Sequence, residues 1–190
     1  MMNAWTRTIG VTALLFISSY STGTPSSRAH GATLYQDYCS GCHSLKYLSW
    51  SQISDDLHLS EHQQRNTTSM TTQDARTWFG KPPPDLSLIS KQRGHQWLKN
   101  YLQGFYPDPQ QRFGMNNHLL PNVMMPNILE SAQHNLTPKE FKTMINDIVN
   151  FLDYAADPSI LLRFKLGWRV LSVLIIGTIL LGLKLRQRSL

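Results

Sequence analysis

Two cysteines and a histidine stand in the pattern Cys-x-x-Cys-His at residues 39–43, and the chain has no other cysteine. This spacing is the attachment pattern of a c-type haem, in which Cys39 and Cys42 form thioether bonds to the haem vinyl groups. His43 then lies beneath the macrocycle, where its imidazole can bind the iron as the proximal ligand. The motif predicts one covalently attached haem c, whose chemistry is the transfer of single electrons.

Three other interpretations of the cysteine pair compete with haem attachment. A thioredoxin-like redox pair normally opens a helix within a βαβ pattern, which this sequence lacks. A zinc site needs further ligands, and the second pair of cysteines that would supply them is missing. A structural disulfide would close a loop of only two residues, which constrains little of the unfolded chain. The sequence therefore favours haem attachment.

Seven methionines are available as the sixth iron ligand. Met124 and Met125 lie in the proline-bounded loop Leu-Pro-Asn-Val-Met-Met-Pro-Asn, where Pro126 disfavours a helical conformation at Met125. An extended backbone there would let a thioether point inward as an axial ligand. Methionine also fills cores, so the residues alone leave ligation and packing as open alternatives. The other five fall in the N-terminal segment, in polar stretches or on a helical stripe: Met1, Met2, Met70, Met115 and Met144.

The elements that must position these residues are helices, because strand patterns are scarce. The clearest helix begins at Thr137, where Thr-Pro-Lys-Glu supplies a capping threonine, a proline at the first position and Glu140 as the reciprocal cap. Its apolar residues recur every three or four positions before Pro158 ends it: Phe141, Met144, Ile145, Ile148, Phe151 and Leu152.

Two further helices are predicted, one from about Gly94 to Phe105 and one around residues 34–38. Prolines and glycines break the pattern into loops at 80–93 and 106–128. The buried face of the Gly94 helix is predicted to hold Trp97, Leu98, Tyr101, Leu102 and Phe105. The sequence thus predicts an all-α domain over residues 30–160, with long loops and a centre that a prosthetic group must fill.

Residues 1–23 resemble a secretory signal peptide, with Arg7 in a short positive region and an apolar stretch from Ile9 to Ile17. About nine apolar residues are too few to span a bilayer of ~30 Å, which argues against an uncleaved anchor. Cleavage is possible after Gly23 or just before His30, and the sequence does not choose between them. Export agrees with the motif, because c-type haem is attached outside the bacterial cytoplasm.

A membrane span is predicted at residues 166–184. Residues 170–183 are uncharged, and the apolar run extends to Leu166 if Arg169 snorkels to the headgroups. A buried core helix is the alternative interpretation. Basic residues are balanced on the two sides, so the haem motif fixes the orientation instead. We expect a single-pass protein of the bacterial inner membrane, with the haem domain in the periplasm and residues 185–190 as a cytoplasmic stub.

The formal net charge of +6 does not describe the exported domain. All 12 acidic residues lie between Asp37 and Asp157, where ten basic residues also lie, which leaves −2. Nucleic acid is therefore not an expected partner, because its binding requires a basic domain surface. A charge of −2 favours a basic soluble partner only weakly.

Several motifs in one order give the chain a specific resemblance. The segment Tyr-Gln-Asp-Tyr-Cys-Ser-Gly-Cys-His-Ser-Leu-Lys-Tyr at 35–47 resembles the haem-binding region of cytochrome c1, the haem subunit of the quinol–cytochrome c oxidoreductase. The loop at 120–126 is similar to the family's axial-methionine loop. Between the two lie further matching segments: Trp78-Phe79-Gly80, Pro83-Pro84-Asp85-Leu86-Ser87-Leu88-Ile89, Gly104-Phe105-Tyr106 and Asn116-Asn117. The resemblance covers roughly residues 31–188.

The resemblance implies a cytochrome c-like haem domain with one C-terminal transmembrane helix. It implies that Met125 rather than Met124 binds the iron, and that Arg93 lies near a haem propionate, although a solvated surface arginine is an equal alternative there. Asp85 and Ser87 are interpreted as turn residues. The segment between Trp50 and Trp78 is short and polar compared with the family, so no docking residues are carried over.

The implied function is that of an electron carrier with no substrate site of its own. Electrons would come from a Rieske iron–sulfur protein and pass to cytochrome c, with the membrane helix packed beside cytochrome b. Ligation by both histidine and methionine suits a carrier, because it leaves no vacant iron site. The alternative is an independent membrane-anchored c-type cytochrome that feeds a terminal oxidase.

Overall fold

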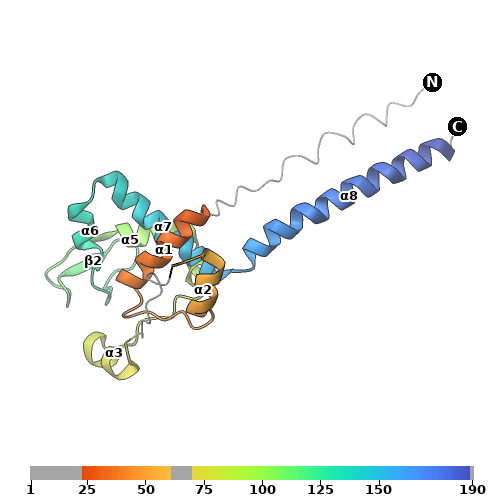
Figure 1. Ribbon diagram of the computed structural model, residues 1–190. Coiled ribbons are helices and arrows are strands. Elements are labelled where there is room, and N and C mark those ends of the chain that lie inside the picture. Colours follow the sequence, from red (N-terminus) through yellow and green to blue (C-terminus); the bar gives the residue numbers. More distant parts are fainter. Residues whose placement is uncertain (1–22, 61–69, 189–190) are drawn as a thin grey trace.

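The computed structural model describes residues 23–60 and 70–188, which form eight helices and one short hairpin (Figure 1). The all-α prediction with a C-terminal apolar helix is confirmed, and the hairpin is an addition to it. The predicted signal peptide lies, except for Gly23, outside the described residues. In chain order the helices are α1 (Pro25–Tyr38), α2 (Trp50–Leu57), α3 (Thr72–Phe79), α4 (Ile89–Arg93), α5 (His95–Gln103), α6 (Glu130–Asn135), α7 (Pro138–Ala156) and α8 (Ile160–Arg188).

Helix α7 is the centre of the domain and begins as the sequence predicts. The Thr137 side chain accepts a hydrogen bond from the backbone of Glu140, while Glu140 accepts one from the backbone of Thr137 at 2.9 Å. This reciprocal cap satisfies two backbone donors that the helix start would otherwise leave unpaired. All six residues of its predicted apolar stripe are buried, so the stripe forms the core.

Helix α1 crosses α7 at close range, and Gly31 makes that possible. A Cβ atom at Gly31 would lie 2.0 Å from the backbone oxygen of Asp147, closer than any side chain permits. The ring of Tyr35, one turn further on, packs 5.4 Å from that of Phe151. The predicted helix at 34–38 is therefore only the last part of a longer helix, whose first turns carry no apolar stripe.

Helices α4 and α5 pack on the other flank of α7. Their bounds differ from the sequence predictions at two places. Residues 89–93 within the predicted loop at 80–93 are helical. Helix α5 ends at Gln103, and Phe105 begins strand β1 (Phe105–Pro107), which pairs antiparallel with β2 (Met115–Asn117). Leu98 and Phe105 are buried, whereas the remaining residues of the predicted face are half-buried: Trp97, Tyr101 and Leu102.

Helix α8 leaves the domain as a long, exposed apolar rod (Figure 1). Its 29 residues span about 43 Å at 1.5 Å each, more than the ~30 Å of a bilayer core. By length and composition it can cross a membrane, and none of its most apolar stretch is buried against the domain. Trp168 and Arg169 are exposed where an interfacial aromatic and a snorkelling arginine are expected.

Candidate functional site

Residues 39–43 form a helical turn directly after α1. The backbone N–H groups of Cys42 and His43 donate to the carbonyl of Cys39 at 3.1 and 2.9 Å. The buried Tyr35 hydroxyl donates to the carbonyl of His43 at 2.9 Å and holds the end of the turn. Positions three and four apart share one side of such a turn, so both cysteines and the histidine face the same way.

His43 is oriented by a carbonyl from a distant segment. Its Nδ1 lies 2.7 Å from the carbonyl oxygen of Pro84, which can only accept, so Nδ1 carries the proton and Nε2 carries a lone pair. Burial lowers the pKa of His43, and the Pro84 hydrogen bond and the nearby Asp85 charge oppose that effect. A neutral imidazole with a fixed tautomer is the form that binds a metal ion.

The Asp85 side chain holds the Pro84 carbonyl in place by joining two loops. Its carboxylate accepts hydrogen bonds from the Ser44 hydroxyl at 2.7 Å and from the Lys46 backbone N–H at 2.9 Å. It also accepts one from the Ser87 backbone N–H at 3.0 Å. Burial alone would raise the pKa of Asp85, but these hydrogen bonds outweigh it and lower the pKa. Asp85 thus clamps together two segments that lie about forty positions apart in the sequence. This role goes beyond that of the turn residue that the sequence predicted.

The two cysteines are free thiols in the structure. Burial raises the pKa of Cys39 to about 12, with a smaller contribution from Cys42. A redox-active cysteine needs a lowered pKa, so the thioredoxin-like alternative gains no support. Within the described residues, no group of three or more histidine, cysteine or acidic side chains forms a possible metal cluster, so the zinc alternative gains none either.

Met124 and Met125 both line the cavity that contains the cysteines and His43. The Tyr101 hydroxyl donates to the Met125 sulfur at 3.6 Å. Burial raises the pKa of Tyr101 to about 12, so its hydroxyl keeps the proton at neutral pH. Sequence reasoning placed Tyr101 on the buried face of a helix but did not foresee this contact. The sequence signal for this role was a tyrosine four positions after a tryptophan on a half-buried helix face, because a partly buried tyrosine hydroxyl usually finds a hydrogen-bond partner.

Two buried asparagines position the methionine loop. Asn117 Nδ2 donates to the Tyr101 carbonyl at 2.8 Å and so ties the hairpin to α5. Asn116 Oδ1 accepts from the backbone of Asn122 at 2.9 Å, three residues before Met125. Asn122 has a positive φ of 60°, which asparagine tolerates better than most residues. The Asn116-Asn117 pair belonged to the resemblance, but no role was predicted for it.

Arg93 also lies at the cavity, at the end of α4. Its guanidinium carbon lies 5.0 Å from the centroid of the Trp97 ring, and Trp97 stacks on Tyr101 at 5.1 Å. Arg93 lines the cavity and is exposed, so both predicted roles, a propionate partner and a solvated arginine, are compatible with its position.

The cavity as a whole suits a c-type haem by the chemistry of its donor set. It brings together two free thiols, an imidazole with an available Nε2 and a thioether, from segments about eighty positions apart. Lys81 and Arg93 are the only Lys, Arg, Asp or Glu residues in the lining within the described ranges. The rest is mostly apolar: Tyr38, Phe79, Pro82, Pro83, Pro84, Leu86, Ile89, Trp97, Leu98, Tyr101, Leu102, Leu120, Val123, Pro126, Ile128, Ile148 and Leu152.

Comparison with known proteins gives consistent matches over most of the chain. The model of the cytochrome C1 family matches residues 24–81 and 69–189. Cytochrome c1 of Allochromatium vinosum is 34% identical over 185 aligned residues, covering 76% of this chain and 76% of its own. A protein of Nitrosomonas europaea named ammonia monooxygenase gamma subunit is 30% identical, covering 76% and 74%. The mitochondrial cytochrome c1 haem protein of Schizosaccharomyces pombe is 25% identical, covering 81% and 63%.

Proposed function

Because the chain belongs to the cytochrome c1 family, we propose that it is the membrane-anchored haem subunit of a quinol–cytochrome c oxidoreductase. It takes single electrons from a Rieske iron–sulfur protein and passes them to cytochrome c. The observation that carries the proposal is the convergence of Cys39, Cys42, His43 and Met125 on one apolar cavity.

One haem c is proposed at this cavity, with thioethers to Cys39 and Cys42 and with His43 and Met125 as iron ligands. When bound, the haem supplies a one-electron change at its iron. The protein fixes the ligands on both sides: Pro84 orients His43, and Tyr101 with the Asn117 tie holds Met125. The apolar lining keeps water away, and Arg93 is proposed to pair with a haem carboxylate, which its planar guanidinium suits.

The mature protein is proposed to begin at Thr24, with the signal peptide ending at residue 23. The Thr24 side chain caps α1, and the Ser27 hydroxyl donates to Asp147 at 2.5 Å. Arg28 is buried. Cleavage before His30 would remove all three. We expect the intact mass of the purified haem protein to correspond to residues 24–190 plus one haem, whereas a mass that starts at His30 would contradict this.

Purification through a tag on the full-length protein tests the function. We expect cytochrome b and a Rieske protein to co-purify from detergent-solubilised membranes, with haem staining on this chain after denaturation. One protein similar to this chain is named ammonia monooxygenase gamma subunit, so the identity of the co-purifying subunits matters. Recovery of this chain with a terminal oxidase alone would favour the independent cytochrome instead.

Truncation after Asp157 provides the matched control for that purification. It removes α8 and leaves every proposed haem ligand in place. The truncated protein should be exported, soluble and haem-loaded, and it should reduce a cytochrome c when a chemical donor is supplied. It should not support quinol-driven electron transfer, because nothing holds it beside cytochrome b. Recovery of the truncated form in salt-washed membranes would show that another surface anchors the protein.

A further inference from the structure

The charges of the described domain are separated between two regions. Residues 70–128, which surround much of the cavity, carry six Lys or Arg and three Asp residues. Helices α1, α2, α6 and α7, with Asp157 after α7, carry eight acidic residues and three basic ones. The small net charge of the whole domain is therefore the sum of a basic region and an acidic region. A partner that binds one region experiences the charge of that region rather than the net charge.

Four exposed basic residues of the first region lie in or near the cavity lining, whereas the fifth, Lys91, pairs with Asp157. Lys81 and Arg93 belong to its lining. Arg112 lies over the Phe113 ring at 5.7 Å, and that ring packs 5.5 Å from Phe79, which also lines the cavity. Arg76 projects from the same helix as Phe79, and Lys46 lies close after the haem motif. We define Lys46, Arg76, Lys81, Arg93 and Arg112 as the basic rim.

Within residues 23–60 and 70–188, no acidic side chain neutralises the basic rim through an ion pair, and of its five members only Arg93 has a proposed anionic partner, the haem carboxylate. The three acidic residues of the region make hydrogen bonds of their own. Asp85 forms the loop clamp, Asp108 accepts from Asn116 at 2.9 Å, and Asp74 accepts from Thr71 at the start of α3.

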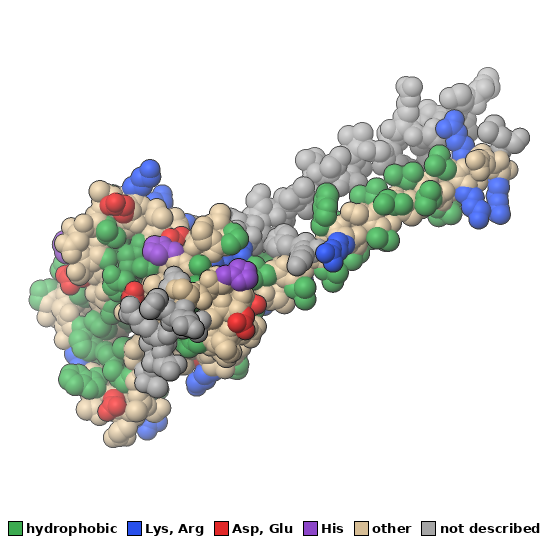
Figure 2. Space-filling model, in the orientation of Figure 1, with side chains coloured by type: hydrophobic (Ala, Val, Ile, Leu, Met, Phe, Trp, Pro, Cys, Tyr) green, Lys and Arg blue, Asp and Glu red, His purple; other side chains and the backbone are tan. Residues whose placement is uncertain are grey.

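Large exposed apolar side chains accompany the basic rim. Trp78 is 62% exposed and immediately precedes Phe79, and Tyr47 is 73% exposed beside Lys46. Leu120 belongs to the cavity lining and is still 42% exposed. Figure 2 shows apolar side chains on the same part of the domain, around α3 and the hairpin. Exposed apolar groups bordered by charges are typical of a protein-docking surface.

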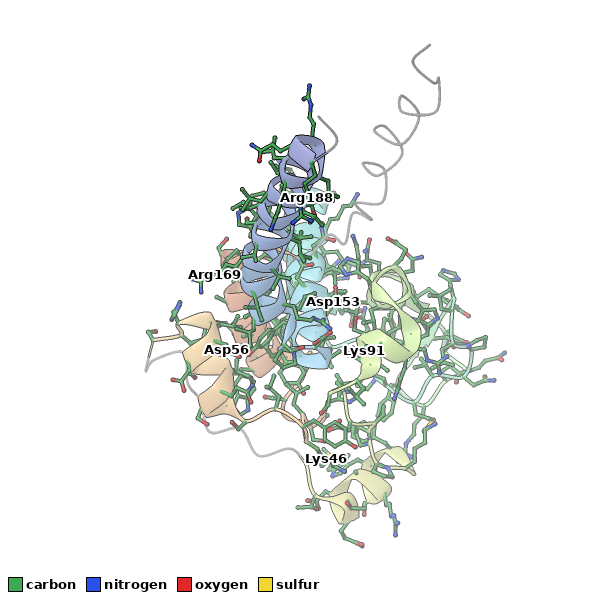
Figure 3. All side chains as sticks on the ribbon, turned by 90° about the vertical axis from the view of Figure 1, so that its right-hand side faces the viewer. Lys46, Asp56, Lys91, Asp153, Arg169 and Arg188 are labelled. Atoms are coloured by element: carbon green, nitrogen blue, oxygen red, sulfur yellow. The ribbon has the colours of Figure 1, made fainter. Side chains whose placement is uncertain are left out.

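Lys46 and helix α3, which carries Arg76, lie at the end of the domain away from the membrane helix. Figure 1 shows α3 at the end of the domain opposite the point where α8 leaves it, and Figure 3 places Lys46 near α3 and far from Arg188. A membrane that α8 crosses would therefore meet the other end of the domain. The exposed surface around the cavity is left to a soluble partner.

We propose that the basic rim and its apolar side chains dock a soluble electron-transfer protein whose own docking face is acidic. The inference rests on the proposed function, because the cavity that the rim surrounds is the proposed haem site. It replaces the weak expectation of a basic partner that the net charge gave. Opposite charges on the two faces would speed their encounter, and this effect would weaken as salt screens the charges.

The test uses the full-length, haem-loaded protein and two soluble c-type cytochromes, one acidic and one basic. Calorimetry with both proteins oxidised measures binding without electron transfer. We expect the acidic cytochrome to bind more tightly, with an affinity that falls as salt rises. The variant Arg76→Glu with Arg112→Glu should weaken its binding by about tenfold or more. Neither residue lines the cavity, so the haem spectrum should not change.

The matched control is Lys139→Glu with Lys142→Glu, the same charge reversal on exposed positions of α7. It should leave binding of the acidic cytochrome within twofold. Tighter binding of the basic cytochrome, or equal losses in the two double variants, would overturn the proposal. An unchanged haem spectrum with co-purifying cytochrome b would show that the proposed function stands even then.

A second measurement tests an anionic membrane as the occupant. The full-length protein is placed in nanodiscs of neutral or anionic lipid, and binding of the acidic cytochrome is compared at one salt concentration. Equal affinities in the two lipids support the soluble partner. An anionic lipid that weakens binding as much as the Arg76 and Arg112 reversal would show that the basic rim lies on the membrane, and would overturn the proposal.

Discussion

Replacing both Cys39 and Cys42 by alanine is expected to abolish haem staining of the denatured protein completely. No thiol would then remain to form a thioether, because the chain has no other cysteine. We also expect the folded domain to be lost, because a bound group that fills the apolar cavity stabilises the folded state. Haem-stained electrophoresis and the amount of exported protein measure both effects.

The matched control for this variant is Gly41→Ala, between the two cysteines. A Cβ atom at Gly41 would meet no other atom within 4 Å, and the backbone there does not have a positive φ. The control should therefore keep its haem and its normal amount. If the double cysteine variant accumulates with an intact fold, the cavity does not depend on a covalent cofactor and the proposal is wrong.

Sequence patterns predicted those parts of the fold in which local chemistry decides the structure. Thr137 and Glu140 cap α7 as expected because a capping box involves only neighbouring residues. The first turns of α1 were not predicted, because they bury Arg28, Gly31 and Ala32 rather than an apolar stripe. Strands of three residues are too short for a period of two to show.

The proposed ligands could be named from sequence, but the groups that orient them could not. The Cys-x-x-Cys-His motif is local, and the methionine loop was found through its prolines. Asp85 acts on Ser44 from 41 positions away, and Tyr101 reaches Met125 across 24. Such contacts depend on how helices and loops pack, which no local pattern records. Their residues therefore looked like ordinary turn and core residues.

Substituting Met125 by leucine is expected to lower the haem reduction potential and to open the iron to carbon monoxide. Leucine keeps most of the side-chain volume but has no thioether, so the iron loses its sixth ligand. Axial ligands set haem potentials over a range of roughly 0.8 V, so we expect a shift on the order of 0.1 V or more. Redox titration and the absorbance change under carbon monoxide measure the two effects.

Met124→Leu and Tyr101→Phe separate ligation from packing at the same loop. Met124 also lines the cavity, but the Tyr101 hydroxyl donates to Met125, so replacing Met124 should change neither property appreciably. Tyr101→Phe removes a donor that draws electron density from the Met125 sulfur and so favours reduced iron. A neutral hydrogen bond is worth about 1 kcal/mol, so its loss should lower the potential by at most about 40 mV without carbon monoxide binding. If Met124→Leu is instead the variant that binds carbon monoxide, the iron ligand is Met124. Met125, which accepts the Tyr101 hydrogen bond, would then only pack in the cavity.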